Sequence, residues 1–314
     1  MPYLHAFGAH LPERVVTNAE IAVRVGKTPE WMESASGIRE RRWAASATSV
    51  TDLAESAAVD CLAKAGTTAS KLGMIIVASG SSAASGFPGP AATVAARLGL
   101  EGTPALDVPM ASAGSLFGLA MAARFASTCG DVLVIGAEKM SSIVELSADE
   151  HGMLDPNTAI LFGDGAGAAL VSETPGPWEI LDSVLHTDGQ FREDLAFDGR
   201  SPLRMNGLSV ILQASRKMPA AIQEVLAKQS IAAGDVTALL LHQANQNLLV
   251  RVGKAVGIAP ERVYSNVGRY GNTSSASMLI AAAEWAAEQA RPGPIVFSAF
   301  GAGFHWGALV ARSV

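Results

Sequence analysis

The sequence has few of the features that mark membrane or secreted proteins. No apolar run approaches the ~18 residues that a membrane-spanning helix needs, and no basic stretch followed by an apolar core indicates a secretory signal near the N-terminus. The only cysteines are Cys61 and Cys129, too few for a disulfide framework. We therefore expect a cytoplasmic protein that neither crosses nor binds a membrane.

Clustered positive charge is also missing. The chain has 23 Lys and Arg against 29 Asp and Glu, a net charge of −6, which argues against nucleic acid as a main ligand. His151, His186 and His305 have no paired ligands at metal spacing, so we expect no metal site. Apolar residues are abundant instead: 49% of the 314 residues are hydrophobic and only 17% are charged. This composition predicts a large, closely packed globule with surface buried against a partner subunit.

Short apolar runs alternate with helical patterns along the chain. The runs at 74–78, 132–135, 238–241 and 295–297 are typical of buried strands. Apolar residues at helical spacing predict helices over 49–65, 115–128 and 208–227. This order predicts an α/β fold with largely parallel sheets. The second half echoes the first, which indicates a duplication with halves at 1–172 and 173–314.

Two polar stretches have more than one interpretation. The basic run Gly37–Arg42 would suit phosphate, but such runs are more often solvated loops. Phe162–Gly167, written FGDGAG, is similar to a phosphate loop but has no Walker lysine and leads into a strand-like segment. We interpret it as a tight turn.

The most distinctive stretch is LDVPMASAGSLF, from Leu106 to Phe117. It reads as a buried strand that turns abruptly into a helix, with small residues at the turn. Ser112 lies at that turn, where the unpaired N–H groups of a helix N-terminus favour negative charge on a nucleophile or its adduct. A serine here can equally be an N-cap, and the stretch alone leaves both roles open.

The second half offers two further polar residues beside predicted elements. His242 directly follows the strand 238–241, at the carboxyl end where open α/β sheets bind ligands. Asn272 lies between Gly271 and a run of small hydroxyl residues that opens a helix. The alternatives are a core histidine satisfied by the backbone and an asparagine helix cap.

These stretches together resemble the β-ketoacyl-acyl-carrier-protein synthase III family, within the thiolase fold. The resemblance runs nearly end to end, from LPERVVTNAEI and EWM…SGIRERR to the final FGAGFHWGA. Its most specific pieces are FGDGAGAAL (162–170), LHQAN (241–245) and YGNTSSAS (270–277). It implies two duplicated βαβαβαββ halves in an αβαβα layered arrangement.

The resemblance implies a nucleophile–His–Asn triad. The nucleophile, a cysteine in the family, aligns with Ser112, and the other two residues align with His242 and Asn272. The nucleophile takes an acyl group from CoA or a carrier protein. The His and Asn then bind the carbonyl of a malonyl thioester, whose decarboxylation yields the carbanion for a Claisen condensation. Backbone N–H groups of Ser112 and Ala302 would form the oxyanion hole.

The resemblance also implies binding residues and partners. Acyl-CoA or acyl-carrier-protein thioesters would be the substrates, with no further cofactor. The expected partner is a second copy of the chain, with Phe87 near the acyl pocket of the other subunit. Substrate or CoA would contact Trp31, Phe87, Asn245 and Phe304.

Several positions depart from the family. Serine replaces the nucleophilic cysteine, either as an engineered change or as a native feature of a serine-based acyltransferase or starter-unit enzyme. A non-catalytic ketosynthase partner fits less well, because His242 and Asn272 are both present. The segment 186–205 is short, and residues that usually recognise CoA or the carrier protein appear as Ala35, Pro156 and Asn247.

Overall fold

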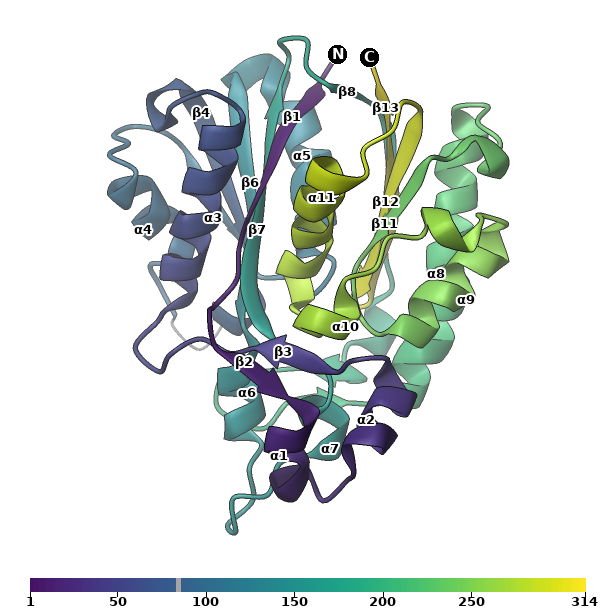
Figure 1. The fold of residues 1–314 in the computed structure, drawn as a ribbon. Helices are drawn as coiled ribbons and strands as arrows, with labels where there is room; N and C mark the ends of the chain where they lie inside the picture. The colour runs from purple at the N-terminus through teal and green to yellow at the C-terminus, as the bar shows by residue number, and fades with distance from the viewer. Residues whose placement is uncertain (83–85) are drawn as a thin grey trace.

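A nine-stranded sheet is the frame of the protein in this computed structural model, which describes residues 1–82 and 86–314 (Figure 1). The strand order is β11-β12-β13-β8-β1-β7-β6-β4-β5. β1 pairs with β7 over its length, but with β8 only through Tyr3–Glu179 and Leu4–Trp178. The strands of the sheet are β1 (Tyr3–His10), β4 (Leu72–Ala78), β5 (Ala105–Val108), β6 (Asp131–Lys139), β7 (Asp164–Ser172), β8 (Trp178–Thr187), β11 (Ala238–Leu241), β12 (Pro294–Gly301) and β13 (His305–Ser313).

The strand order repeats in the two halves of the chain. The first half reads β5-β4-β6-β7-β1, and the second reads β11-β12-β13-β8. In the second half, Leu239 of β11 forms a parallel bridge with Val263. This bridge corresponds to the pairing of β4 with β5 in the first half. This repeat is what an internal duplication would leave, and the division into 1–172 and 173–314 remains our proposal.

The expectation of largely parallel sheets is wrong. β4 pairs in parallel with β5 and β6, and β11 with β12. The remaining neighbours are antiparallel, including β6–β7, β1–β7, β12–β13 and β13–β8. A strand covered on both faces is continuously apolar in either direction, so its apolar run carries no information about direction.

Helices form three layers around the two halves of the sheet. α5 (Gly114–Cys129) and α11 (Ser277–Glu288) lie between the halves, where α11 packs on β1 and β7 and α5 packs on β4, β6 and β13 (Figure 1). α3 (Val50–Lys64) and α4 (Pro90–Arg97) cover the outer face of the first half. α8 (Gly207–Lys228) and α9 (Gln246–Val256) lie on the outer side of the second. The expected αβαβα arrangement is therefore confirmed.

A small lobe closes one end of the layers (Figure 1). It contains α1 (Asn18–Val25), α2 (Pro29–Ser36), β2 (Val15–Thr17), β3 (Glu40–Arg42), α6 (Met140–Leu146) and α7 (Pro156–Ala159). Within the described residues, no helix combines the length and apolarity needed to cross a bilayer.

Arg41 of β3 holds this lobe together and corrects the interpretation of its segment as a solvated loop. Its side chain is fully buried, and it donates hydrogen bonds to Asn18 Oδ1 at 2.8 Å and to the carbonyl of Ile160 at 2.9 Å. Burial lowers the pKa of the guanidinium to about 10. Because the side chain is fully buried, Arg41 is not available to a phosphate in solution.

Candidate active site

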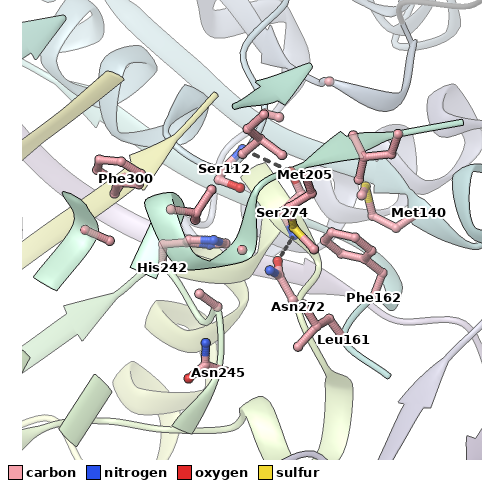
Figure 2. Close-up of a pocket in the computed structure, with 18 of the residues that line it drawn as sticks. Ser112, Met140, Leu161, Phe162, Met205, His242, Asn245, Asn272, Ser274 and Phe300 are labelled. Carbon is pink, nitrogen blue, oxygen red and sulfur yellow. Dashed lines mark hydrogen bonds between the residues drawn. The ribbon is translucent and has the colours of Figure 1, made fainter. Parts of the chain in front are cut away.

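A cavity of about 120 Å³ lies where the start of α5, the end of β11 and the segment before α11 meet. Ser112, His242, Asn272 and Asn245 all line it (Figure 2). No lining residue in the described part of the chain is charged. Most of the wall is apolar, and its larger side chains are Met140, Ile143, Leu161, Phe162, Leu195, Phe197, Leu203, Met205, Val210, Ile211, Leu248 and Phe300.

Ser112 occupies a sharp turn rather than a helix cap. Its φ is +66°, a left-handed conformation that is uncommon outside glycine. α5 begins two residues later, and its N-cap is Ala113, so the N-cap role for Ser112 is wrong. Gly301, the last residue of β12, packs against the turn: a Cβ there would lie 3.0 Å from Ser112 Cβ and overlap the carbonyl oxygen of Ala111. The turn therefore needs glycine at 301.

The Ser112 main chain and side chain have different surroundings. Its N–H, a predicted oxyanion donor, is bonded to Ser274 Oγ at 3.0 Å. Within residues 1–82 and 86–314, its own Oγ makes no hydrogen bond to another protein group. The other predicted donor, Ala302, follows Gly301 beside the same turn but does not line the cavity. No base among the described residues is therefore hydrogen-bonded to the hydroxyl.

Asn272 is held in place by a segment that sequence analysis treated as a turn. Its N–H donates to the carbonyl of Leu161 at 2.8 Å, and its own carbonyl accepts the N–H of Gly163 at 3.1 Å. Its Oδ1 accepts the N–H of Ser274 at 2.8 Å. The capping alternative is wrong, because the N-cap of the short helix 274–276 is Thr273 and that of α11 is Ala276. Nδ2 remains free of protein partners in the described part of the chain.

Residues 164–167 of the FGDGAG stretch are the start of β7, so the interpretation of the stretch as a tight turn is wrong, although its role is structural. Asp164 is fully buried and accepts hydrogen bonds from the N–H groups of Ala44 and Ser141, both at 2.7 Å. It also accepts one from Ser141 Oγ at 2.6 Å. Phe162, the first residue of the stretch, lines the cavity. The stretch therefore shapes the site without offering a phosphate loop.

His242 follows β11 directly and is 4% exposed. Its N–H donates to the carbonyl of Ser298 at 2.9 Å, and its ring Nδ1 lies 2.6 Å from Ser277 Oγ. Burial lowers the pKa of the imidazole to about 4, partly opposed by the backbone of Ser274. The ring is therefore neutral at pH 7, and it interacts with the Ser277 hydroxyl as well as with the backbone of Ser274.

Side chains that the sequence did not single out join the two halves of the site. Ser275 Oγ donates to the carbonyl of Met110 at 2.6 Å, and Ser115 Oγ donates to the carbonyl of Ser275. The fully buried Glu138 accepts the N–H groups of Gly80 at 3.0 Å and Ser275 at 3.3 Å. The serines lie in conspicuous small-residue runs, but nothing in the sequence distinguishes Glu138 from a surface carboxylate.

The four predicted binding residues have different fates. Asn245 lines the cavity, and its Oδ1 caps α9 by accepting the N–H of Leu248 at 2.9 Å. Trp31 lies on α2, 45% exposed, with Lys27 Nζ 5.1 Å from its ring centre, and does not line the cavity. Phe87 is 96% exposed.

Phe304 is fully buried behind the cavity wall, so the expected direct contact with substrate is not seen. Its ring packs on Phe300 at 4.7 Å and on Phe191 at 5.3 Å, and Phe300 is the aromatic that lines the cavity. The strand alternation of β12 turns Phe300 inward, a detail that the sequence motif alone does not reveal.

Neither cysteine replaces Ser112. Cys61 is buried in α3, where burial raises the pKa of its thiol to about 12, and Cys129 lies at the far end of α5. Neither lines the cavity. No group of three or more His, Cys, Asp or Glu side chains suited to a metal occurs among residues 1–82 and 86–314.

Comparisons with known proteins agree with this geometry. The profile of "3-Oxoacyl-[acyl-carrier-protein (ACP)] synthase III" matches residues 106–189, and that of its C-terminal part matches residues 226–313. A β-ketoacyl-[acyl-carrier-protein] synthase III of Oleidesulfovibrio alaskensis is 35% identical, with 99% of this chain and 98% of the relative covered.

Solved structures extend the similarity to the fold. The crystal structure of 3-oxoacyl-[acyl-carrier-protein] synthase III from Aquifex aeolicus has a TM-score of 0.91 at 33% identity, covering 99% of this chain and 100% of that one. A priming β-ketosynthase from a polyketide biosynthetic pathway has a TM-score of 0.88 at 27% identity, covering 100% and 96%. With a matching profile in each half and a relative aligned end to end, the chain belongs to the 3-oxoacyl-[acyl-carrier-protein] synthase III family of condensing enzymes.

Proposed function

We propose that this protein loads an acyl group from an acyl thioester onto Ser112 and condenses it with the carbanion released by decarboxylation of a malonyl thioester. Ser112 is the nucleophile, and His242 and Asn272 bind the malonyl thioester carbonyl. The substrates are acyl-CoA and acyl-carrier-protein thioesters, and no further cofactor takes part.

The proposal is supported above all by two side chains that line the cavity, those of Asn272 and His242. Asn272 Oδ1 and His242 Nδ1 are both engaged by serines, at 2.8 Å and 2.6 Å. Asn272 Nδ2 and His242 Nε2 are therefore the polar atoms that these side chains offer to a bound carbonyl (Figure 2). Two donors on one oxygen are what a developing enolate requires, and each such donor can contribute ~3 kcal/mol.

The steps balance without an external reagent other than a proton. In loading, Ser112 Oγ attacks the thioester carbonyl, the C–S bond breaks, and the thiol leaves with the hydroxyl proton. In condensation, the C–C bond to the malonyl carboxylate breaks and carbon dioxide leaves. The resulting carbanion attacks the Ser112 ester, forming the new C–C bond, and the released Ser112 oxygen takes up a proton.

The apolar cavity favours decarboxylation of the malonyl group. A malonyl carboxylate placed among Met140, Phe162 and Met205 meets no cationic side chain in the described part of the chain. A carboxylate is costly to hold in such surroundings. Loss of carbon dioxide removes that charge from the apolar pocket and leaves it on the carbonyl oxygen, where His242 and Asn272 bind it.

A second candidate function rests on Ser112 itself. A serine-based acyltransferase would pass the acyl group from the Ser112 ester to a hydroxyl, an amine or a carrier protein, with no decarboxylation. A serine ester is stable enough for that task, but the hydroxyl needs a base for loading. Both functions need that loading step, so we rank this one second because acyl transfer without decarboxylation forms no enolate for Asn272 Nδ2 and His242 Nε2 to bind.

The surface beside the cavity supports a carrier protein or CoA as the thioester carrier. Leu208 and Leu212 of α8 are 82% and 44% exposed next to the lining residues Val210 and Ile211. Arg251 and Lys254 are exposed on the adjacent α9, which contains no acidic residue. Apolar side chains with nearby cations suit an acidic protein or a phosphate-bearing carrier.

A homodimer is part of the proposal. β5 is an edge strand of the sheet, with one side unpaired in the chain described here, and such edges invite pairing. Phe87 is 96% exposed, a poor choice for a solvent-facing aromatic. Both features favour a second copy of the chain against this side of the molecule.

The test separates loading from condensation. Intact-mass spectrometry after incubation with a panel of acyl-CoAs reports the acyl groups that load, and peptide mapping reports the residue that carries them. Carbon dioxide release from malonyl-CoA or a malonyl-carrier protein reports condensation. Acyl transfer to Ser112 without carbon dioxide release from either donor would favour the acyltransferase.

A further inference from the structure

Ser277, the first residue of α11, contacts both His242 and the neighbouring main chain. Its Oγ lies 2.6 Å from His242 Nδ1 and accepts the N–H of Gln243 at 3.1 Å. Ser277 is 2% exposed, so water does not satisfy it. Ser277 has no part in the binding or chemistry proposed above.

The position of Gln243 makes Ser277 Oγ a hydrogen-bond acceptor. The Gln243 side chain is fully buried, with Nε2 donating to the carbonyl of Leu241 at 2.8 Å and Oε1 accepting the N–H of Asn266 at 3.1 Å. These bonds lock the main chain just after β11. The Gln243 N–H can only donate, so one lone pair of Ser277 Oγ is taken.

The hydroxyl hydrogen of Ser277 then has one destination. In the part of the chain that the structure describes, His242 Nδ1 is the only acceptor within hydrogen-bond distance of Ser277 Oγ. If Nδ1 carried the proton instead, the Ser277 hydrogen would be buried without a partner, which is unfavourable. Ser277 therefore donates to Nδ1, and a neutral imidazole must carry its proton on Nε2.

We propose that Ser277 is a positioning residue that holds His242 as the Nε2–H tautomer, the form that the donor role in the proposed function requires. This inference rests on the proposed function for the identity of the carbonyl that Nε2–H meets. Asn272 is fixed in the same way, because Ser274 N–H engages its Oδ1 and leaves Nδ2 as the donor. One serine per side chain thus leaves one N–H donor on each.

The direct test is the position of the His242 proton. Protein labelled with ¹⁵N at histidine is examined by long-range ¹H–¹⁵N correlation, which distinguishes the two tautomers, and the His242 signals are identified by their loss in His242→Gln. The expected result is a proton on Nε2 and none on Nδ1 at pH 7. A proton on Nδ1 would overturn the proposal, whatever the enzyme's activity.

The kinetic test uses two variants at position 277. Ser277→Ala removes the donor, and Ser277→Thr keeps a hydroxyl on the same Cβ. We expect Ser277→Ala to lower kcat for carbon dioxide release from malonyl-CoA by about 10-fold or more, with KM changed less than about threefold. Ser277→Thr should remain within about threefold of the parent, and loading of Ser112 should change little in either. Equal losses in loading and release, or no loss in Ser277→Ala, would contradict the proposal.

The two tests keep this inference separate from the proposed function. A proton on Nε2 in a protein that releases no carbon dioxide from a malonyl thioester would overturn the proposed condensation and support the role of Ser277. Circular dichroism and thermal melts of both variants establish that they are folded before kinetics are compared.

Discussion

Replacing Ser112 with cysteine changes one atom at the point where the acyl group is loaded. The turn has the geometry that an exposed nucleophile needs, with φ at +66° and α5 starting two residues later. The helix N-terminus favours a negative charge there. Yet a serine hydroxyl does not ionise near neutral pH, and no base contacts Ser112 Oγ in the described structure. Loading by the parent protein should therefore be slow.

The size of the effect follows from ionisation. A cysteine with an unperturbed pKa of ~8.5 is about one-tenth thiolate at pH 7.5, and the helix N-terminus raises that fraction. We expect Ser112→Cys to load an acyl group at least ~10-fold faster, a barrier lower by about 1.4 kcal/mol. Residue 112 lines the cavity, which has room for the larger sulfur atom, so the fold should accept the change.

The assay is single-turnover acylation followed by intact-mass spectrometry and peptide mapping. Ser112→Ala is the matched control, because it removes the nucleophile and reports any acylation of Cys61 or Cys129. The reasoning is refuted if Ser112→Cys loads no faster than the parent. In that case the serine is adapted to its task, and the ordinary ketosynthase mechanism gives way to a serine-based acyltransferase.

Four further predictions test other parts of the site. Asn272→Ala should slow carbon dioxide release by about 100-fold while changing acyl loading much less, because only release uses both donors; equal losses in the two half-reactions would contradict this division. The folded-state pKa of His242 is about 4, below the ~6.5 of the unfolded chain, so between these values the unfolded state binds more protons. Urea unfolding should therefore show the parent losing ~2 kcal/mol between pH 7 and pH 5, with that share absent in His242→Gln. Gly301→Ala should abolish loading and lower the melting temperature, since its methyl group would collide with the carbonyl of Ala111. Light scattering should show a dimer at micromolar concentration, and Phe87→Asp should weaken it; a monomeric parent would count against Phe87 as an interface residue.

Local sequence determined the elements that depend on neighbouring residues. The strand 238–241 was predicted with the bounds that β11 has, because four consecutive apolar residues end at a polar histidine. The helix predicted over 49–65 is α3, started by a capping box between Ser49 and Asp52. Ser112, His242 and Asn272 were also identified at element boundaries, where short-range patterns are strongest, and the structure places all three on one cavity.

Contacts between residues that are distant in the sequence could not be predicted from local patterns. Arg41 lies in a run of charges that suggested exposure to solvent, yet it is fully buried, where Asn18 and the carbonyl of Ile160 accept its hydrogen bonds. Strand direction depends on how connections return, which an apolar run does not record. Phe300, and not Phe304, lines the cavity, because the alternation of side chains along β12 places Phe300 on that face. The position of the proton on His242 depends on Ser277, which is 35 residues away in the sequence. Local sequence patterns thus identify the residues suited to chemistry. Which of their atoms are free to bind a substrate depends on how the two halves of the chain pack together.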